Sequence, residues 1–132
     1  MSELFSSDWM SSYQEFWNAE PELSGALGKI NFNSVIGYGF KGEAEPKGVL
    51  IVENGRVETA GPFVGQALNW DLRADPATWK SWQENPPGMM GLGMAYASSQ
   101  LQFVIGDYAA MIKDPQMAGP FIKSFAIMAQ LA

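Results

Sequence analysis

Cysteine and histidine are both missing from this sequence of 132 residues. Without cysteine, the chain cannot form disulfides, zinc fingers, iron–sulfur clusters or a thiol nucleophile. Without histidine, it cannot form a Ser–His–Asp triad, a histidine-ligated haem or zinc site, or a histidine general base. We therefore expect no metal site, no cofactor and no catalytic residue of these kinds.

Basic residues are also scarce, because eight Lys and Arg stand against fourteen Asp and Glu, giving a net charge of -6. A phosphate backbone would repel this charge and no local basic run offsets it, so we expect no nucleic-acid partner. The longest apolar runs, such as 48–52, are far shorter than the ~20 residues that cross a bilayer. The start, Met-Ser-Glu, has neither a basic region nor an apolar signal core. The expectation is a cytoplasmic protein with no stable membrane insertion.

Aromatic residues and methionine are instead abundant, since aromatics make up 13% of a chain that also has eight Met. A chain of this length is expected to form one domain, residues 1–132, that buries about two-thirds of its unfolded surface. The aromatic and methionine excess then has two interpretations. Either these side chains fill an ordinary core, or they surround an internal space, because Met adapts to variable apolar partners.

The first thirty residues predict two helices. The first begins at a cap on Ser7 or Asp8 and ends near Ala19, and the second spans 21–27. The apolar stripe of the first helix consists of Trp9, Tyr13, Phe16 and Trp17.

Four segments with a period of two then predict strands joined as an antiparallel meander. These strands cover 35–40, 48–53, 56–59 and 68–73. The pair Asn54-Gly55 predicts a tight hairpin between the second and third strands. In the first strand, Gly37 and Gly39 lie opposite the apolar face. They either let another group approach the backbone or mark a flattened strand.

The fourth strand carries the charged residues that come closest to a catalytic arrangement. Asp71 and Arg73 project to its polar face, and Asp75 follows. We expect solvated charges here, with Asp71 and Arg73 paired, because exposed ion pairs are common on protein surfaces. Nothing in the spacing selects a general acid, a general base or an activated lysine.

The second half of the chain predicts four more helical segments and one strand. They cover 76–85, 89–98 (a weak helix or a lid), 101–105 (the strand), 108–112 and 115 onwards. Gly119-Pro120 is expected to kink or split the last helix. Strands and helices are segregated rather than alternating, which indicates an α+β fold.

Several short segments, in this order, resemble the sterol carrier protein 2-like lipid-binding domains. They are Trp-Asn-Ala-Glu-Pro-Glu at 17–22, the hairpin Glu-Asn-Gly at 53–55, the strand at 68–73 with the following helix carrying Trp79 and Trp82, and Ser-Gln-Leu-Gln-Phe-Val-Ile-Gly-Asp at 99–107 with Ala-Ala-Met-Ile at 109–112. The likeness spans about residues 8 to 130.

This resemblance implies a five-stranded, mostly antiparallel sheet covered on one face by helices, with an apolar tunnel between the two layers. It also implies that the tunnel binds a long apolar small molecule such as a fatty acid, acyl-CoA, a sterol or an isoprenoid, with no catalysis. The apolar faces and the methionine-rich segment identify candidate tunnel-lining residues, each of which taken singly is more commonly plain core. The candidates are Tyr38, Phe40, Trp70, Trp79, Trp82, Met89, Met90, Met94, Phe103, Ile105, Met111, Phe121, Phe125 and Met128.

The segment 86–94 is the candidate portal, because its glycines loosen the backbone and its methionines can shift. A wide turn capping the sheet is the alternative interpretation. Three alternatives to a lipid carrier stay open at this point. In the first, an accessory factor presents a quinone precursor or acyl-CoA to partner enzymes. In the second, a module with a filled core docks a partner or forms a homodimer. In the third, the chain is an enzyme that works without His or Cys.

Overall fold

Five strands form one mixed sheet with the order β3-β2-β1-β4-β5. The computed structural model describes residues 3–131 of the chain. The strands are β1 (Ser34–Phe40), β2 (Gly48–Glu53), β3 (Arg56–Pro62), β4 (Trp70–Ala74) and β5 (Gln102–Ile105). Three of the four strand pairings are antiparallel, so the predicted mostly antiparallel sheet is confirmed.

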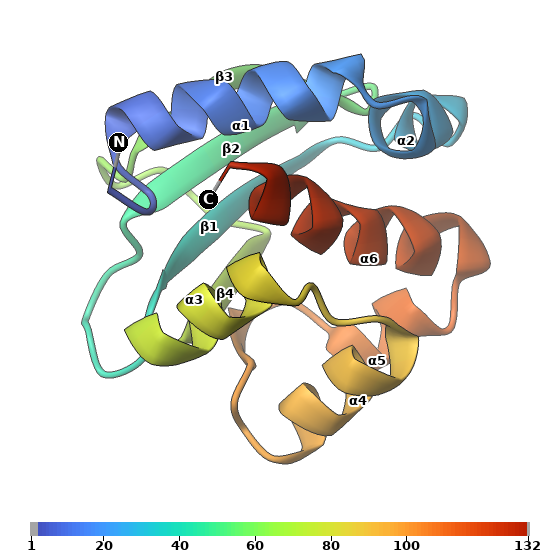
Figure 1. Ribbon diagram of the computed structural model, residues 1–132. Coiled ribbons are helices and arrows are strands. Elements are labelled where there is room, and N and C mark those ends of the chain that lie inside the picture. Colours follow the sequence, from blue (N-terminus) through green and yellow to red (C-terminus); the bar gives the residue numbers. More distant parts are fainter. Residues whose placement is uncertain (1–2, 132) are drawn as a thin grey trace.

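Helices cover one face of this sheet (Figure 1). They are α1 (Ser7–Ala19), a π-helical turn (Pro21–Gly25) that continues into α2 (Ala26–Lys29), α3 (Pro76–Glu84), α4 (Met89–Ala97), α5 (Tyr108–Ile112) and α6 (Pro115–Gln130). This arrangement confirms the α+β fold class. Helix α6 runs through Gly119 and Pro120 without ending, so the predicted split at this point does not occur.

The prediction of a four-stranded antiparallel meander is wrong for its last strand. Strand β4 lies parallel to β1, with Ile36 beside Trp70 and Tyr38 beside Leu72. The chain between β3 and β4 crosses the sheet face that carries no helices, where Leu68 comes within contact distance of Gly37. A period of two identifies which face of a strand is buried, but it does not identify the neighbouring strand.

The sheet face that carries no helices, here called the outer sheet face, is covered by other parts of the chain. The glycines of β1 leave room for these parts to approach the strand. A Cβ atom at Gly39 would lie 2.8 Å from the Cα of Pro46 and 3.2 Å from the Cδ of Arg73. The first interpretation of these glycines therefore holds, because another part of the chain approaches the backbone here. Because glycine leaves this space free, the turn after β1, residues 41–47, folds back over the outer sheet face.

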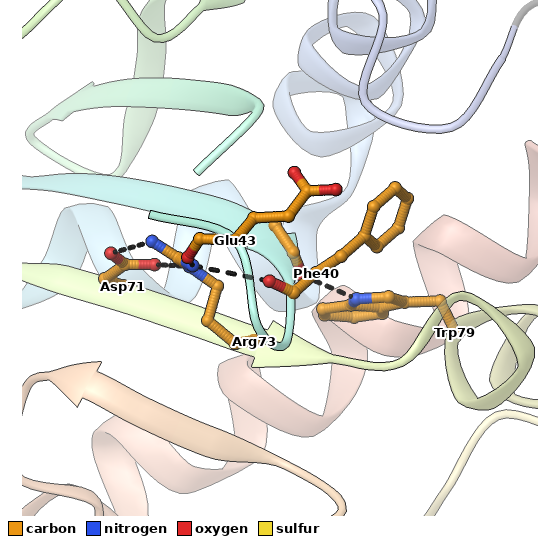
Figure 2. A network of polar contacts seen from close by, with 6 residues as sticks. Phe40, Glu43, Asp71, Arg73 and Trp79 are labelled. Carbon is orange, nitrogen blue, oxygen red and sulfur yellow. Dashed lines mark hydrogen bonds and ion pairs between the residues drawn. The ribbon is translucent and has the colours of Figure 1, made fainter. Parts of the chain in front are cut away.

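Asp71 and Arg73 are paired as expected but are buried, with only 3% and 4% of their surface exposed. The Arg73 guanidinium donates to both Asp71 carboxylate oxygens, from Nε at 2.6 Å and from Nη2 at 2.9 Å. Its Nη1 donates to the main-chain carbonyls of Phe40 at 3.3 Å and Glu43 at 2.7 Å (Figure 2). The expectation of solvated charges is therefore wrong, because the turn after β1 lies over the pair and its Glu43 carbonyl accepts a hydrogen bond from Arg73.

Helix α1 packs along β2 and β3 through its apolar stripe. Trp9, Tyr13 and Trp17 are buried, whereas Phe16 is 39% exposed and lies outside the stripe. The helix begins after a cap at Ser6, one residue earlier than the predicted cap at Ser7 or Asp8.

The predicted hairpin between β2 and β3 is confirmed. Both Asn54 (φ 50°) and Gly55 (φ 81°) have positive φ, as a two-residue hairpin turn requires. The Trp17 indole N–H of α1 donates to the Gly55 carbonyl at 2.9 Å, which fixes the helix against the turn.

Candidate functional site

An apolar pocket of about 50 Å³ lies between the sheet and the helices. It is enclosed by residues from α1, the π-helical turn, α2, β1, β4, α5 and α6. These residues are Trp17, Leu23, Leu27, Phe32, Ile36, Tyr38, Trp70, Leu72, Met111, Met117, Pro120, Phe121 and Ser124.

The sheet supplies the floor of the pocket from two neighbouring strands. Ile36 and Tyr38 alternate along β1, and Trp70 and Leu72 alternate along β4, so each pair projects to the same face. The parallel register places Ile36 beside Trp70 and Tyr38 beside Leu72. The four side chains therefore form one continuous apolar surface.

Helix α6 supplies most of the roof. Met117, Phe121 and Ser124 recur at spacings of four and three, which places them on one helical face together with Pro120. Ser124 and Pro120 are small, so they fill less of the space above the floor than the neighbouring rings do. Met111 of the short helix α5 closes the remaining side.

No charged side chain lines the pocket, and its polar atoms are already hydrogen-bonded within the protein. The Trp17 indole N–H donates to Gly55, the Trp70 indole N–H donates to Ser34 Oγ at 3.2 Å, and Ser124 Oγ donates to the Phe121 carbonyl at 2.6 Å. Within residues 3–131, no buried side-chain nitrogen or oxygen is left without a partner. The pocket therefore offers a ligand apolar contact rather than a charge or a free hydrogen-bonding group.

The tyrosine hydroxyls at the inner wall stay neutral. Tyr13 and Tyr38 share a hydrogen bond with 3.1 Å between their oxygens. Burial raises the pKa of the Tyr38 hydroxyl, and burial followed by the neighbouring Tyr38 raises the pKa of the Tyr13 hydroxyl well above its ordinary value. Neither group can act as a base near neutral pH, because both remain protonated.

The small volume of the pocket limits how a long ligand could enter it. About 50 Å³ exceeds the space that a water molecule needs, but it is about a third of an engineered cavity of roughly 150 Å³ that binds benzene. An acyl or isoprenoid chain therefore enters only when the lining moves. Met111 and Met117 are the side chains best suited to move, because methionine has three rotatable bonds and no branch.

The structure distributes the predicted tunnel-lining residues over three environments. Those that line the pocket are Tyr38, Trp70, Met111 and Phe121. Those packed in the core or partly buried against it, outside the pocket lining, are Phe40, Trp79, Trp82, Phe103, Phe125 and Met128. Those exposed to solvent are Met89, Met90, Met94 and Ile105.

The exposed group reflects how α4 and β5 are packed. Helix α4 buries Leu92 and Ala95 and leaves Met89, Met90 and Met94 at 48%, 81% and 70% exposure, so these methionines do not line the pocket. Strand β5 is the last strand of the sheet, and nearly all of it is exposed. The prediction that these residues face a tunnel is corrected for this pocket.

Several lining residues were missed by the sequence analysis, although some carried a signal. Ile36 and Leu72 share the period-two faces that contain Tyr38 and Trp70, and Leu23 and Leu27 are four residues apart on a helical segment. The other missed residues are Trp17, Phe32, Pro120 and Ser124, whereas Met117 lies on the helical face of the predicted Phe121. A serine and a proline have no periodic signature of a pocket, since their contribution is their small size.

Among residues 3–131, no group of three or more Asp and Glu side chains is arranged to hold a metal ion. No helix in that part of the chain is both long enough and apolar enough to span a bilayer.

Comparison with known proteins gives a consistent result for the fold. No protein-family model matches the sequence, and no curated protein matches it. Among solved structures, the crystal structure of sterol carrier protein 2 superposes with a TM-score of 0.77 at 20% identity, covering 98% of this chain and 100% of that one.

Two further structures are similar. A conserved hypothetical protein of Thermus thermophilus, described as a candidate sterol carrier protein, has a TM-score of 0.71 at 18% identity and covers 98% of this chain and 90% of its own. The UbiJ-SCP2 ubiquinone synthesis protein has a TM-score of 0.58 at 15% identity, covering 93% and 88%. Likeness at such low identity establishes a shared fold.

Proposed function

The chain has the sterol carrier protein 2-like fold, and we propose that it binds the apolar part of a lipid-like molecule in the pocket beneath α6 without catalysing a reaction on it. The observation that carries this proposal is the lining of the pocket, which is apolar and uncharged and has its polar atoms already bonded within the protein. Ligand sites of this kind bind mainly through buried apolar area.

The binding free energy is sufficient if the pocket opens along its length. Each buried methylene group contributes about 0.8 kcal/mol, so a chain of about a dozen contributes roughly 10 kcal/mol before the costs of ordering. Micromolar affinity requires about 8 kcal/mol. Met111 and Met117 in the lining provide the adaptability that opening requires.

The charges of the protein support a carrier rather than an enzyme. Within residues 3–131, the buried charged side chains are Asp71 and Arg73, which lie on the outer sheet face, away from the pocket, and bind the turn after β1. Among residues 3–131, no carboxylate or amine lines the pocket itself. A bound molecule would therefore meet no group that can transfer a proton near neutral pH.

The ligand class follows from the same lining. Fatty acids, acyl-CoA, sterols and isoprenoids all present a long uncharged portion, and a charged head group would have to remain outside the pocket. The alternative role is to present such a molecule to partner enzymes. The similarity to a ubiquinone synthesis protein supports that alternative, and copurification of enzymes with this protein would favour it.

We propose the segment 86–94 as the route of access. Pro86, Pro87 and Gly88 line a surface groove against α6, and Pro120 borders both this groove and the pocket. Hydrogen exchange should be fast at 89–94 in the free protein and slower with ligand. Slow and identical exchange in both states would show that the segment is fixed structure.

The deciding experiment is a titration with a fluorescent long-chain fatty acid. Met117→Trp should fill the pocket and weaken binding by about tenfold, a cost near 1.4 kcal/mol. Val64→Trp is the control, because it introduces the same bulky side chain at an exposed position outside the pocket and outside the proposed route of access. A flat titration with fatty acid, acyl-CoA, sterol and isoprenoid alike would refute the proposal. In a separate measurement, solvent extraction of the purified protein would identify any copurified lipid.

A further inference from the structure

The surface formed by α4 is the most apolar exposed part of the molecule. Of the eight large apolar side chains that are most exposed in residues 3–131, six lie between 89 and 105. They are Met89, Met90, Met94, Tyr96, Val104 and Ile105. Apolar side chains concentrated in this way are typical of an interaction surface.

The same part of the chain carries no charge. Residues 86–106 contain no Asp, Glu, Lys or Arg, although 17% of the chain is charged. The non-apolar positions of α4 and of the two residues after it are Gly91, Gly93, Ser98 and Ser99, and the uncharged Gln100 and Gln102 follow. A helix with bulky apolar side chains and small uncharged neighbours can insert shallowly between lipid head groups, but it gains nothing from anionic lipid.

The helix is nevertheless anchored to the fold. Leu92 is fully buried and Ala95 is 2% exposed, so α4 is fixed by these residues while the methionines project outward. Docking would therefore require no unfolding of α4. Methionine side chains can adjust to an irregular lipid surface because they are unbranched and flexible.

Charge selects among the partners that such a surface could bind. A second copy would bring together two chains of net charge -6, and an anionic bilayer would repel the same charge. A bilayer of zwitterionic lipid has no net charge and complements an uncharged apolar surface. We infer that the exposed face of α4, formed by Met89, Met90 and Met94, docks on the interface of an electrically neutral phospholipid bilayer.

The position of this surface next to the pocket is consistent with that partner. Tyr96 of α4 contacts Phe103 of β5 with ring centroids 5.9 Å apart, and Phe103 contacts Phe121 of the pocket at 5.9 Å. A bilayer held at α4 would thus lie beside the site where we propose that lipid binds. This placement matters only if the pocket takes lipid, so this part of the inference rests on the proposed function.

Flotation with phosphatidylcholine vesicles tests the inference. The protein should bind small sonicated vesicles more strongly than large extruded ones, because high curvature exposes more acyl chain between head groups. Replacing a third of the lipid with phosphatidylserine should not strengthen binding. The double variant Met90→Glu and Met94→Glu should bind at least about tenfold more weakly, since two apolar contacts are lost and two charges are added.

Val64→Glu is the matched control, because Val64 is 77% exposed in the loop after β3, at the other edge of the sheet. This control should float like the unchanged protein. Equal flotation of the double variant and the control would overturn the inference. A concentration-dependent dimer that the double variant abolishes, with no vesicle binding by the unchanged protein, would overturn it in favour of a second copy.

These assays test ligand binding in the pocket and vesicle docking at α4 separately. Met117→Trp should lose the soluble fatty-acid probe and still float with vesicles. The double variant should have the same probe affinity at equilibrium, because its two positions lie outside the pocket lining and a change in the route of access alters only the rate of entry. This binding also shows that the double variant is folded. Vesicle binding without probe binding by the unchanged protein would refute the proposed function and leave the docking surface standing.

Discussion

Helix α6 covers two regions of the sheet that are packed in different ways. Phe125 stacks on Trp79 with centroids 6.1 Å apart and meets Trp82 edge to face at 5.5 Å, which leaves it 1% exposed. Phe121, four residues earlier on the same helix, lines the pocket and is only partly buried. The two phenylalanines share one helical face, but only one of them lies in a filled interior.

The difference arises from the neighbouring side chains rather than from the fold. Around Phe125, aromatic rings from α3 and α6 interlock in edge-to-face and stacked pairs. Around Phe121, the roof includes Pro120 and Ser124, which reach less far toward the floor. One covering helix can therefore pack tightly over one part of a sheet and leave a pocket over another part.

The largest expected effect is on the packed side. Phe125→Ala should lower the free energy of unfolding by about 3–5 kcal/mol, because it creates a cavity in a closely packed cluster. Urea unfolding followed by tryptophan fluorescence measures this change. A loss of less than about 1 kcal/mol would mean that Phe125 borders open space, since exposed sites tolerate truncation.

Phe121→Ala should cost less, about 1–2 kcal/mol, because the side chain is partly exposed and already borders a cavity. The same variant should change the affinity for a fluorescent fatty acid several-fold, whereas Phe125→Ala should not change it directly. Equal unfolding costs for the two variants, with equal ligand affinities, would remove the distinction between the two regions.

The tyrosine pair between the two regions should give the protein a sensitivity to alkaline pH. The folded protein keeps protons that unfolded tyrosine releases above about pH 10, because burial raises the pKa of Tyr13 and Tyr38. The free energy of unfolding should therefore be undiminished by this pair below that pH and fall above it. Tyr13→Phe should cost about 1 kcal/mol at neutral pH and make the alkaline fall shallower. An unchanged pH profile would show that the pair does not titrate in this way.

Met111→Leu should have the smallest effect on stability, under about 1.5 kcal/mol, because the two side chains have similar volumes. Leucine is branched and less flexible, so the pocket should open more slowly. Stopped-flow measurement of fatty-acid release should show slower dissociation. Release as fast as in the unchanged protein would assign the opening to another part of the lining.

Periodicity and turn chemistry predicted most of the local structure. The stripe on α1, the Asn54-Gly55 hairpin and the floor residues Tyr38 and Trp70 follow from residue types at fixed spacings. The parallel position of β4 and the burial of Asp71 do not follow, because the first depends on the chain crossing the outer sheet face and the second on the turn after β1, which lies over Arg73, the partner of Asp71. Local patterns determine which face is apolar, whereas the neighbours of that face are set by tertiary packing.

The candidate site shows the same limit. Phe121 and Phe125 have the same residue type and lie on one helical face, so no sequence pattern separates a pocket residue from a packed one. The distinction depends on what other segments pack against each position, because Phe125 meets Trp79 and Trp82 of α3, whereas Phe121 meets Phe103 of β5 and Tyr108 of α5 beside the pocket. The sequence predicts the exposed methionines of α4 as tunnel-lining residues for a related reason. An uncharged apolar segment has the composition of a pocket lining, and the sequence alone does not show which of its faces is buried.

The hydrogen bonds from Arg73 to the turn after β1 have a practical consequence. Arg73 donates to main-chain carbonyls there, so the exposed side chain of Ala44 can be exchanged without loosening the turn. The chain has no cysteine, and a cysteine introduced at Ala44 would be its single thiol. A dye attached to that thiol would report on tumbling and complex formation from the sheet face away from the pocket and α6.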